Sequence, residues 1–222
     1  MTERKKPKPK PKPKATVDPA DMHEILLGNP AWLAIDGAEK SGWSLYWGDK
    51  HWYGTCDPDQ LQDEIPFDRI PDGVKFLVSI ERGFYGDSST WGDKSKPKCG
   101  ECGEPIKAPW EKKFKGPGKK GAVTMLETQG YIVATMVSKL RGRLAAGMWR
   151  PTSSVWRPIL GIPNRRAEGK AMAIALCRGP WGCDKITSDD VAEAIAINQA
   201  AIKTVGLVFP VMRKKPWHEV KG

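Results

Sequence analysis

Two short apolar runs that each end in an acidic residue constrain the fold of this chain more than any other feature. Residues 31–36 read Ala-Trp-Leu-Ala-Ile-Asp, and residues 76–81 read Phe-Leu-Val-Ser-Ile-Glu. Runs of this length and apolar content predict strands that are buried in a sheet. Because a carboxylate at the end of a buried strand is costly unless its charge is compensated, Asp36 and Glu81 are candidate functional residues.

Two further acids lie on a helix predicted from Asp189 to about residue 205. Thr187 or Ser188 is a suitable N-cap, and acidic residues in the first turn suit the helix dipole. Asp190 and Glu193 are three residues apart, so they share one helix face, although Asp189 could replace Asp190. Each acid alone has an ordinary alternative role: a turn residue, a partner of Arg82, a helix-terminal charge or a solvated side chain.

If these four acids meet, divalent metal ions are the usual compensation for their charge. Mg²⁺ prefers oxygen ligands, and a common use of such sites is the attack of hydroxide on phosphodiesters. We therefore expect Asp36, Glu81, Asp190 and Glu193 to bind metal and to be catalytic in a nuclease. A non-catalytic nucleic-acid-binding protein has no use for four converging carboxylates.

The 222 residues suffice for one domain, and the apolar content of 40% predicts a globular chain. Its net charge is +10. Residues 1–14 carry six Lys and one Arg against one Glu, with Lys and Pro alternating. We expect residues 1–20 to be a disordered, extended basic arm, and residues 211–222 to be a basic tail. Such an arm favours polyanion partners, although it could also only increase solubility.

The order of patterns predicts an α/β domain over residues 21–210. Strands are expected at 31–36, 42–47 and 51–56 as an antiparallel meander, with a central fourth strand at 75–81 and a short fifth at 147–151. A short helix near 59–64 and helices at about 122–145, 153–160, 166–177 and 189–205 would flank this mixed five-stranded sheet.

Residues 84–120 interrupt the domain as an inserted loop rich in Gly, Lys and Pro. Cys99 and Cys102 have the spacing of half a zinc site, which would be a structural Zn²⁺ site. Cys177 and Cys183 could complete it, or a dimer could share the ion, but burial of Cys177 is the favoured alternative. Lys112, Lys113 and Lys115 lie beside Trp110 and Phe114, so this loop could bind DNA or simply be solvated.

Several motifs resemble RuvC-type Holliday junction resolvases, especially the bacteriophage branch. The matching motifs are Ile35-Asp36 with Gly42-Trp43, Ser79-Ile80-Glu81, Gly130-Tyr131-Ile132, Val155-Trp156-Arg157 with Gly161 and Lys170, and the run from Asp190 to Ile197. They span residues 31–205 apart from the loop. The family often has Asp-Pro-Gly where this chain has Asp36-Gly37-Ala38, and more often Asp where it has Glu193.

The resemblance implies a ribonuclease H-like fold and a homodimer that cuts four-way junctions to leave 5′-phosphates. It also implies two Mg²⁺ ions per site, for which Mn²⁺ would substitute, on the four acids named above. Basic residues near the metals are expected to contact DNA, namely Arg157, Arg165, Arg166 and Lys170. A nuclease for other branched or flap DNA, or a non-catalytic DNA-binding protein, are the alternatives.

The chain also suggests where such a protein would work. It has no apolar segment behind its charged N-terminus, no run long enough for a membrane span, and an odd number of cysteines. We therefore expect no membrane partner and a reducing, cytoplasmic location, in the bacterial host if a phage encodes the chain.

Overall fold

The computed structural model describes residues 19–37, 40–82, 119–145 and 147–208. Its sheet has the strand order β3-β2-β1-β4. The strands are β1 (Ala31–Asp36), β2 (Ser41–Trp47), β3 (Lys50–Cys56) and β4 (Phe76–Ile80). The α/β class and the mixed sheet flanked by helices are thus confirmed, with each strand within one residue of its predicted position.

β1 is a central strand of the sheet, and all six of its residues are buried. It pairs antiparallel with β2, where Asp36 is opposite Gly42, and parallel with β4, where Ile35 is opposite Ile80. A strand with helices on both faces is expected to be apolar along its length, and β1 is so up to Asp36. The pairing brings the ends of β1 and β4 to the same edge of the sheet.

The prediction of a fifth strand is wrong, because the sheet in the described part of the chain has four strands. Residues 147–151 run parallel to β4 but form only an isolated bridge, between Ser79 and Trp149, and a second bridge joins Phe76 to Leu144. Trp149 exchanges two hydrogen bonds with β4, to Val78 and from Ile80, both of 2.9 Å. Pro151 has no N–H to continue this ladder, which keeps the segment short.

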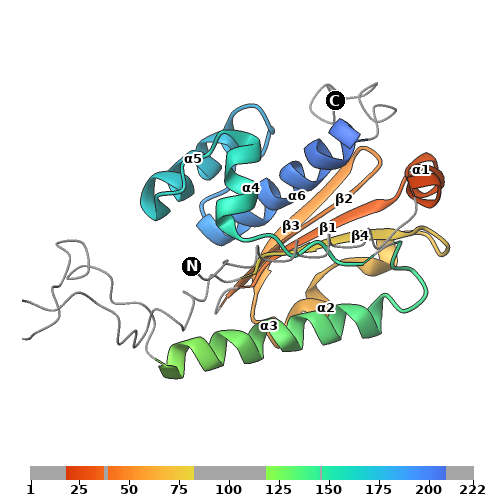
Figure 1. Ribbon diagram of the computed structural model, residues 1–222, viewed down its shortest axis with the longest axis horizontal. Helices are drawn as coiled ribbons and strands as arrows, with labels where there is room; N and C mark the ends of the chain where they lie inside the picture. The colour runs from red at the N-terminus through yellow and green to blue at the C-terminus, as the bar shows by residue number, and fades with distance from the viewer. Residues whose placement is uncertain (1–18, 38–39, 83–118, 146, 209–222) are drawn as a thin grey trace, which may run out of the picture.

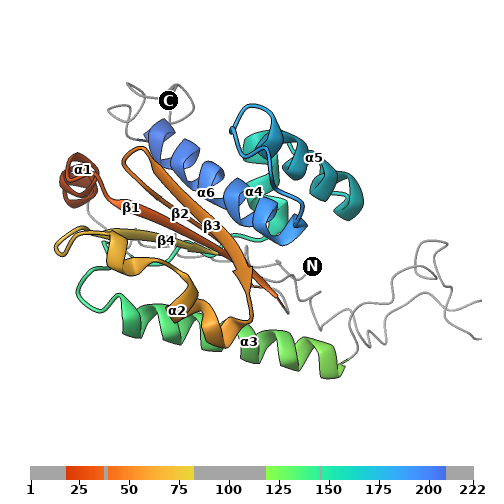
Figure 2. The ribbon, with the colours of Figure 1, turned by 180° about the vertical axis from the view of Figure 1, so that it is seen from behind.

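Helices cover both faces of the sheet (Figure 1). α2 (Leu61–Glu64) and α3 (Lys119–Lys139) lie on one face, and α4 (Ser153–Leu160), α5 (Arg166–Arg178) and α6 (Asp189–Val208) lie on the other. The view from behind shows the same two layers, with α1 (Pro19–Leu27) at one end of the sheet (Figure 2). Short 3-10 turns, η1 (Pro58–Gln60) and η2 (Phe67–Arg69), precede and follow α2.

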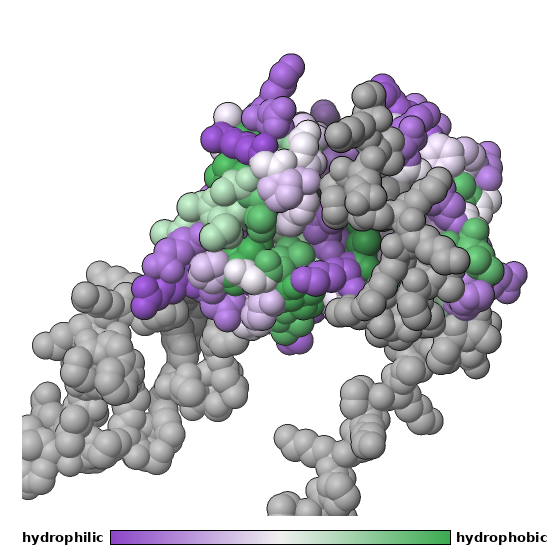
Figure 3. Space-filling model, turned by 90° about the horizontal axis from the view of Figure 1, so that it is seen from above, coloured by the Kyte–Doolittle hydropathy of each residue, from purple (hydrophilic) through white to green (hydrophobic). Residues whose placement is uncertain are grey.

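Each layer has its own apolar core. Ile132 and Met136 of α3, with Leu140 just beyond it, pack on the sheet with Leu33 and Ile35 of β1. On the other face, a second cluster contains Ala34, Trp156, Ala173, Ile195 and Ala196 among others. Viewed from above, the outer surface carries hydrophilic residues with separate hydrophobic patches between them (Figure 3).

The helices predicted at 153–160, 166–177 and 189–205 are confirmed to within three residues, whereas the helix predicted to end at about residue 145 ends at Lys139. α1 was not predicted, and its first residues, 19 and 20, lie within the arm that was expected to be disordered. Residues 1–18, the loop at 83–118 and residues 209–222 lie outside the described residues, so the predicted arm, most of the inserted loop and the tail stay predictions. None of the described helices combines the length and apolarity that a membrane span requires.

Candidate active site

Asp36 and Glu81 lie side by side because their strands are parallel neighbours. The backbone N–H of Glu81 donates to the carbonyl of Ile35 at 2.9 Å, which continues the β1–β4 ladder to the acid itself. A side-chain hydrogen bond joins the two carboxyl groups, and Asp36 is only 7% exposed. The two strand-end acids that the sequence predicts therefore meet at one point.

Burial raises the pKa of Asp36 well above its usual value, and the negative charges of Glu81, Glu193 and Asp190 raise it further. The pKa of Glu81 is also raised by burial, but the hydrogen bonds from Asp36 and Trp156 oppose this shift. The surroundings of Asp36 all raise its pKa, whereas those of Glu81 partly cancel, so Asp36 is the carboxyl group of the pair that more strongly favours its protonated form.

α6 brings the other two acids to the same edge because its first turn packs closely on β2. A Cβ atom on Gly42 would overlap the backbone of Asp190, so only glycine permits this approach. Glu193 is 4% exposed, one turn further along the buried face of α6. Burial and the neighbouring Asp189 raise the pKa of Asp190. Glu81, Asp190 and Glu193 thus all act electrostatically on Asp36, although they come from different elements.

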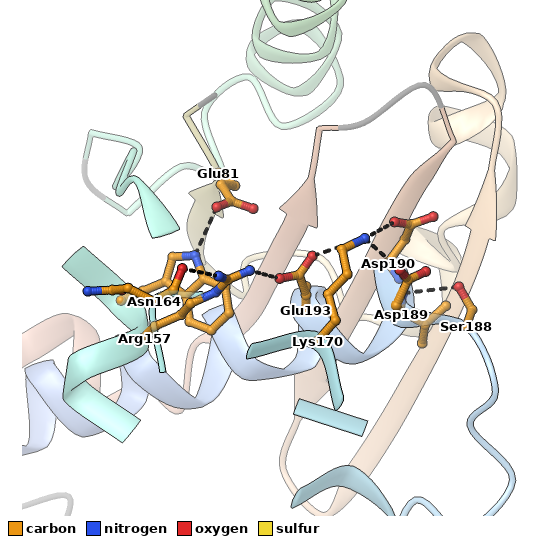
Figure 4. A network of polar contacts seen from close by, with 10 residues as sticks. Glu81, Arg157, Asn164, Lys170, Ser188, Asp189, Asp190 and Glu193 are labelled. Carbon is orange, nitrogen blue, oxygen red and sulfur yellow. Dashed lines mark hydrogen bonds and ion pairs between the residues drawn. The ribbon is translucent and has the colours of Figure 1, made fainter. Parts of the chain in front are cut away.

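Two basic residues neutralise the α6 side of this cluster (Figure 4). Arg157 of α4 donates from Nη2 to Oε1 of Glu193, with both side chains buried. Lys170 of α5 lies 2.5 Å from Asp189 and 3.7 Å from both Asp190 and Glu193. The pKa of Lys170 is raised because the hydrogen bond to Asp189 and the nearby acids outweigh its burial. The Glu193 carboxylate therefore lies between two cations.

Trp156 supplies a contact that the sequence did not predict. Its indole Nε1–H donates to Oε1 of Glu81 at 3.1 Å, while its ring is fully buried in the core. Trp156 is therefore a core residue that also contacts the candidate site. The role of Asp189 as the main partner of Lys170 was also missed, because both contacts depend on how α4 and α5 pack against the sheet.

The four acids offer the all-oxygen ligands that Mg²⁺ favours. Among the described side chains Asp36 and Glu81 form no ion pair, so their buried charge lacks a full counter-ion within the protein, which suits a cation. However, no group of three or more His, Cys, Asp and Glu in the described parts of the chain is arranged so that it could hold a metal ion. With Arg157 and Lys170 in place, the α6 carboxylates face these protein cations instead.

The other predicted site residues are placed as follows. Arg165 is exposed and pairs with Glu168 at 3.1 Å, and Arg166 is exposed near the acids. Arg157 differs from them because it is 5% exposed and pairs with Glu193, so DNA could reach it only if it turned outward. Cys99, Cys102, Lys112, Lys113 and Lys115 lie outside the described residues.

Cys177 and Cys183 are both buried free thiols at the end of α5 and just beyond it. Cys183 Sγ lies 3.7 Å from Nδ1 of His51, and burial raises the pKa of both thiols. The expected burial of Cys177 is confirmed. A raised thiol pKa disfavours the thiolate, so these cysteines have the properties of core residues.

Comparison with known proteins adds no assignment to this geometry. No protein-family model matches the chain, and a search of curated proteins gives no match.

Proposed function

We propose that this protein is a Mg²⁺-dependent endonuclease that resolves four-way DNA junctions, on a ribonuclease H-like fold. The observation that carries the proposal is the meeting of Asp36, Glu81, Asp190 and Glu193, from β1, β4 and α6, at one edge of the sheet. Burial and the other three acids raise the pKa of Asp36, which costs stability, so the proximity of these acids favours a functional origin.

Mg²⁺, when bound, would supply a hydroxide nucleophile and stabilise charge on the phosphodiester. The residues that would hold it are the same four acids, which would have to move closer together, because no three of them are arranged to hold a metal ion in this structure. The pKa of Asp36 is raised by burial and by the neighbouring acids, and binding of a cation there requires that Asp36 gives up its proton. Cleavage is therefore expected to increase with pH through the range in which Asp36 loses its proton.

A DNA substrate is supported by the charge around the acids. Three basic residues lie at or near the N-terminal end of α5: Arg165, Arg166 and Lys170. Arg165 and Arg166 are exposed. Together with the basic N-terminal arm, they provide phosphate contacts that do not depend on sequence. The resemblance to junction resolvases supports a homodimer with one site for each cut strand, acting in the cytoplasm.

The test is a cleavage assay on a synthetic four-way junction with Mg²⁺ or Mn²⁺, in which the ends of the products are mapped. We expect paired nicks with 5′-phosphates. Asp36→Asn and Glu81→Gln should abolish cutting while junction binding, measured in Ca²⁺, stays nearly unchanged. Asp63→Asn is the matched control, because Asp63 is exposed on α2. Unimpaired cutting by both site variants would refute the assignment.

The choice of substrate within this class is tested in the same assay. Y-shaped and flap DNA are added as separate substrates at equal concentration. Faster cutting of these than of the four-way junction would replace junction resolution by the related activity on other branched DNA.

A non-catalytic DNA-binding protein is the second candidate, and one observation favours it. Arg157 and Lys170 already neutralise Glu193 and its neighbours, so these ion pairs could serve only to hold α4, α5 and α6 together. This candidate predicts tight junction binding by the wild type, with no cutting in Mg²⁺ or Mn²⁺.

A further inference from the structure

Two adjacent side chains of α4 hold two acids that come from different elements. Trp156 Nε1 donates to Glu81, at the end of β4, and Arg157 Nη2 donates to Glu193 of α6. Successive residues on a helix point about 100° apart, so one short helix can reach both sides of the acid cluster. The backbone of Arg82 also donates to the carbonyl of Pro151 at 2.7 Å, which ties the approach to α4 to the end of β4.

Both of these side chains are buried and have close neighbours. Trp156 is fully buried among residues of β1, α5 and α6. The guanidinium carbon of Arg157 lies 5.3 Å from the centre of the Trp156 ring, and its Nη1 donates to the carbonyl of Asn164 at 3.2 Å. Gly169 of α5 leaves the space for it, since a Cβ there would come within 2.9 Å of Nη1. The two acids are therefore held by side chains that are themselves packed in the core.

Stability alone does not explain this arrangement. A buried ion pair often contributes no more to folding than apolar residues of similar volume, because both charges lose their hydration. Arg157 also leaves its Nε–H buried without a partner, which is a further cost. Such costs are retained where geometry matters to function.

We propose that α4 is the positioning element of the candidate active site. Trp156 fixes the carboxylate of Glu81, Arg157 fixes that of Glu193, and their shared helix sets the separation of these two acids. This inference rests on the proposed nuclease function. It assigns Trp156 and Arg157 as positioning residues, since each acts through an acid and neither needs to touch the substrate.

The main test compares Trp156→Phe with Trp32→Phe. Both variants lose an indole N–H from a buried ring, but Nε1 of Trp32 has no hydrogen-bond partner and Trp32 packs in a different apolar cluster. The measurements are the unfolding midpoint, Mn²⁺ binding by calorimetry without DNA, and the Mg²⁺ concentration that gives half-maximal junction cutting. A lost hydrogen bond to a charged group predicts a shift of about tenfold in the two metal midpoints for Trp156→Phe only.

The role of Arg157 is tested with the same measurements. Arg157→Lys keeps the charge but cannot bond Glu193 and Asn164 together, and Arg143→Lys is its control. Arg143 also donates through its guanidinium, to the carbonyls of Pro71 and Ile70 at 2.8 and 3.2 Å, on a different part of the fold. We expect Arg157→Lys to weaken metal binding and cutting by about tenfold, with little change for Arg143→Lys.

The outcomes separate this inference from the function on which it rests. If the wild type neither binds Mn²⁺ nor cuts DNA, the proposed function fails and the positioning role fails with it. If the wild type does both, but each α4 variant behaves like its control in the metal midpoints, the nuclease stands and the positioning role is overturned. Shifts confined to the α4 variants support the inference.

Discussion

Gly42 of β2 lies so close to Asp190 of α6 that a single added methyl group would overlap the Asp190 carbonyl. Gly42 is also the residue opposite Asp36 in the β1–β2 pairing. One glycine therefore sets how near the acids of α6 come to the acid of β1. The amide of Asn198, further along α6, donates to the carbonyls of Trp32 at 3.1 Å and Ser44 at 2.9 Å, which fastens the helix to the sheet at a second point.

Gly42→Ala is expected to push the first turn of α6 away from the sheet. Overpacking at a close backbone contact costs about 1–3 kcal/mol of unfolding free energy. Because Asp190 and Glu193 would move with the turn, binding of Mn²⁺ should weaken as well. Gly130→Ala is the control, since Gly130 is in a helix where a Cβ would meet nothing within 4 Å. A denaturant titration that finds both variants as stable as the wild type would contradict the packing argument.

Asp36→Asn is expected to stabilise the metal-free protein at neutral pH. The pKa of Asp36 is raised in the folded state, so its contribution to stability is largest at low pH and is lost as pH increases through that folded pKa. Asparagine avoids this loss. The variant should unfold at higher denaturant concentration than the wild type in a chelating buffer at neutral pH, and the difference should shrink as pH is lowered. A wild type that is the more stable of the two at neutral pH would exclude a strained acid pair.

His51 predicts the opposite dependence on pH. Burial lowers the pKa of His51 to about 3, and its ring stacks on Tyr46 with centroids 3.6 Å apart. Since the unfolded chain binds a proton near its usual pKa of about 6.5, folding loses about 2 kcal/mol between neutral pH and about pH 5. His51→Gln removes this dependence, so the difference in slope between the two proteins measures it. Parallel slopes would show that His51 titrates normally.

Gly169→Ala should act through Arg157. The new Cβ would lie 2.7 Å from the Pro163 carbonyl and about as close to the guanidinium group, so one of them has to move. We expect a loss of about 1–3 kcal/mol of unfolding free energy. In an Arg157→Met background the same glycine change should cost less, because the guanidinium is gone. Strictly additive effects in this double-mutant cycle would separate Gly169 from the ion pair.

The sequence predicted the elements better than it predicted how they contact one another. The strand ending at Asp36 was correct in both bounds because its apolar run is short and stops at a charge. The composition of residues 147–151 predicts a strand, but in the structure this segment contributes only an isolated bridge to β4. Composition alone does not show that Pro151 ends the hydrogen bonding at this point. α1 was missed because its helix follows directly on the Lys-Pro arm.

The four acids that meet in the structure could be singled out in the sequence because each stands at a recognisable place: the end of an apolar run, or one face of a helix. Their partners carry no such mark. Trp156 looks like any core tryptophan, and only the packing of α4 against the sheet turns its N–H toward Glu81. Likewise, Gly169 matters through its distance from Arg157, a residue on a different helix.

The two edge strands of the sheet, β3 and β4, differ in whether their outer side is hydrogen-bonded. Residues 143–151 already take up hydrogen bonds of β4, whereas β3 has no neighbour on its outer side within the described part of the chain. An extended peptide that lengthened this sheet would therefore have to dock along β3, and any such growth of the sheet proceeds in one direction, away from Glu81.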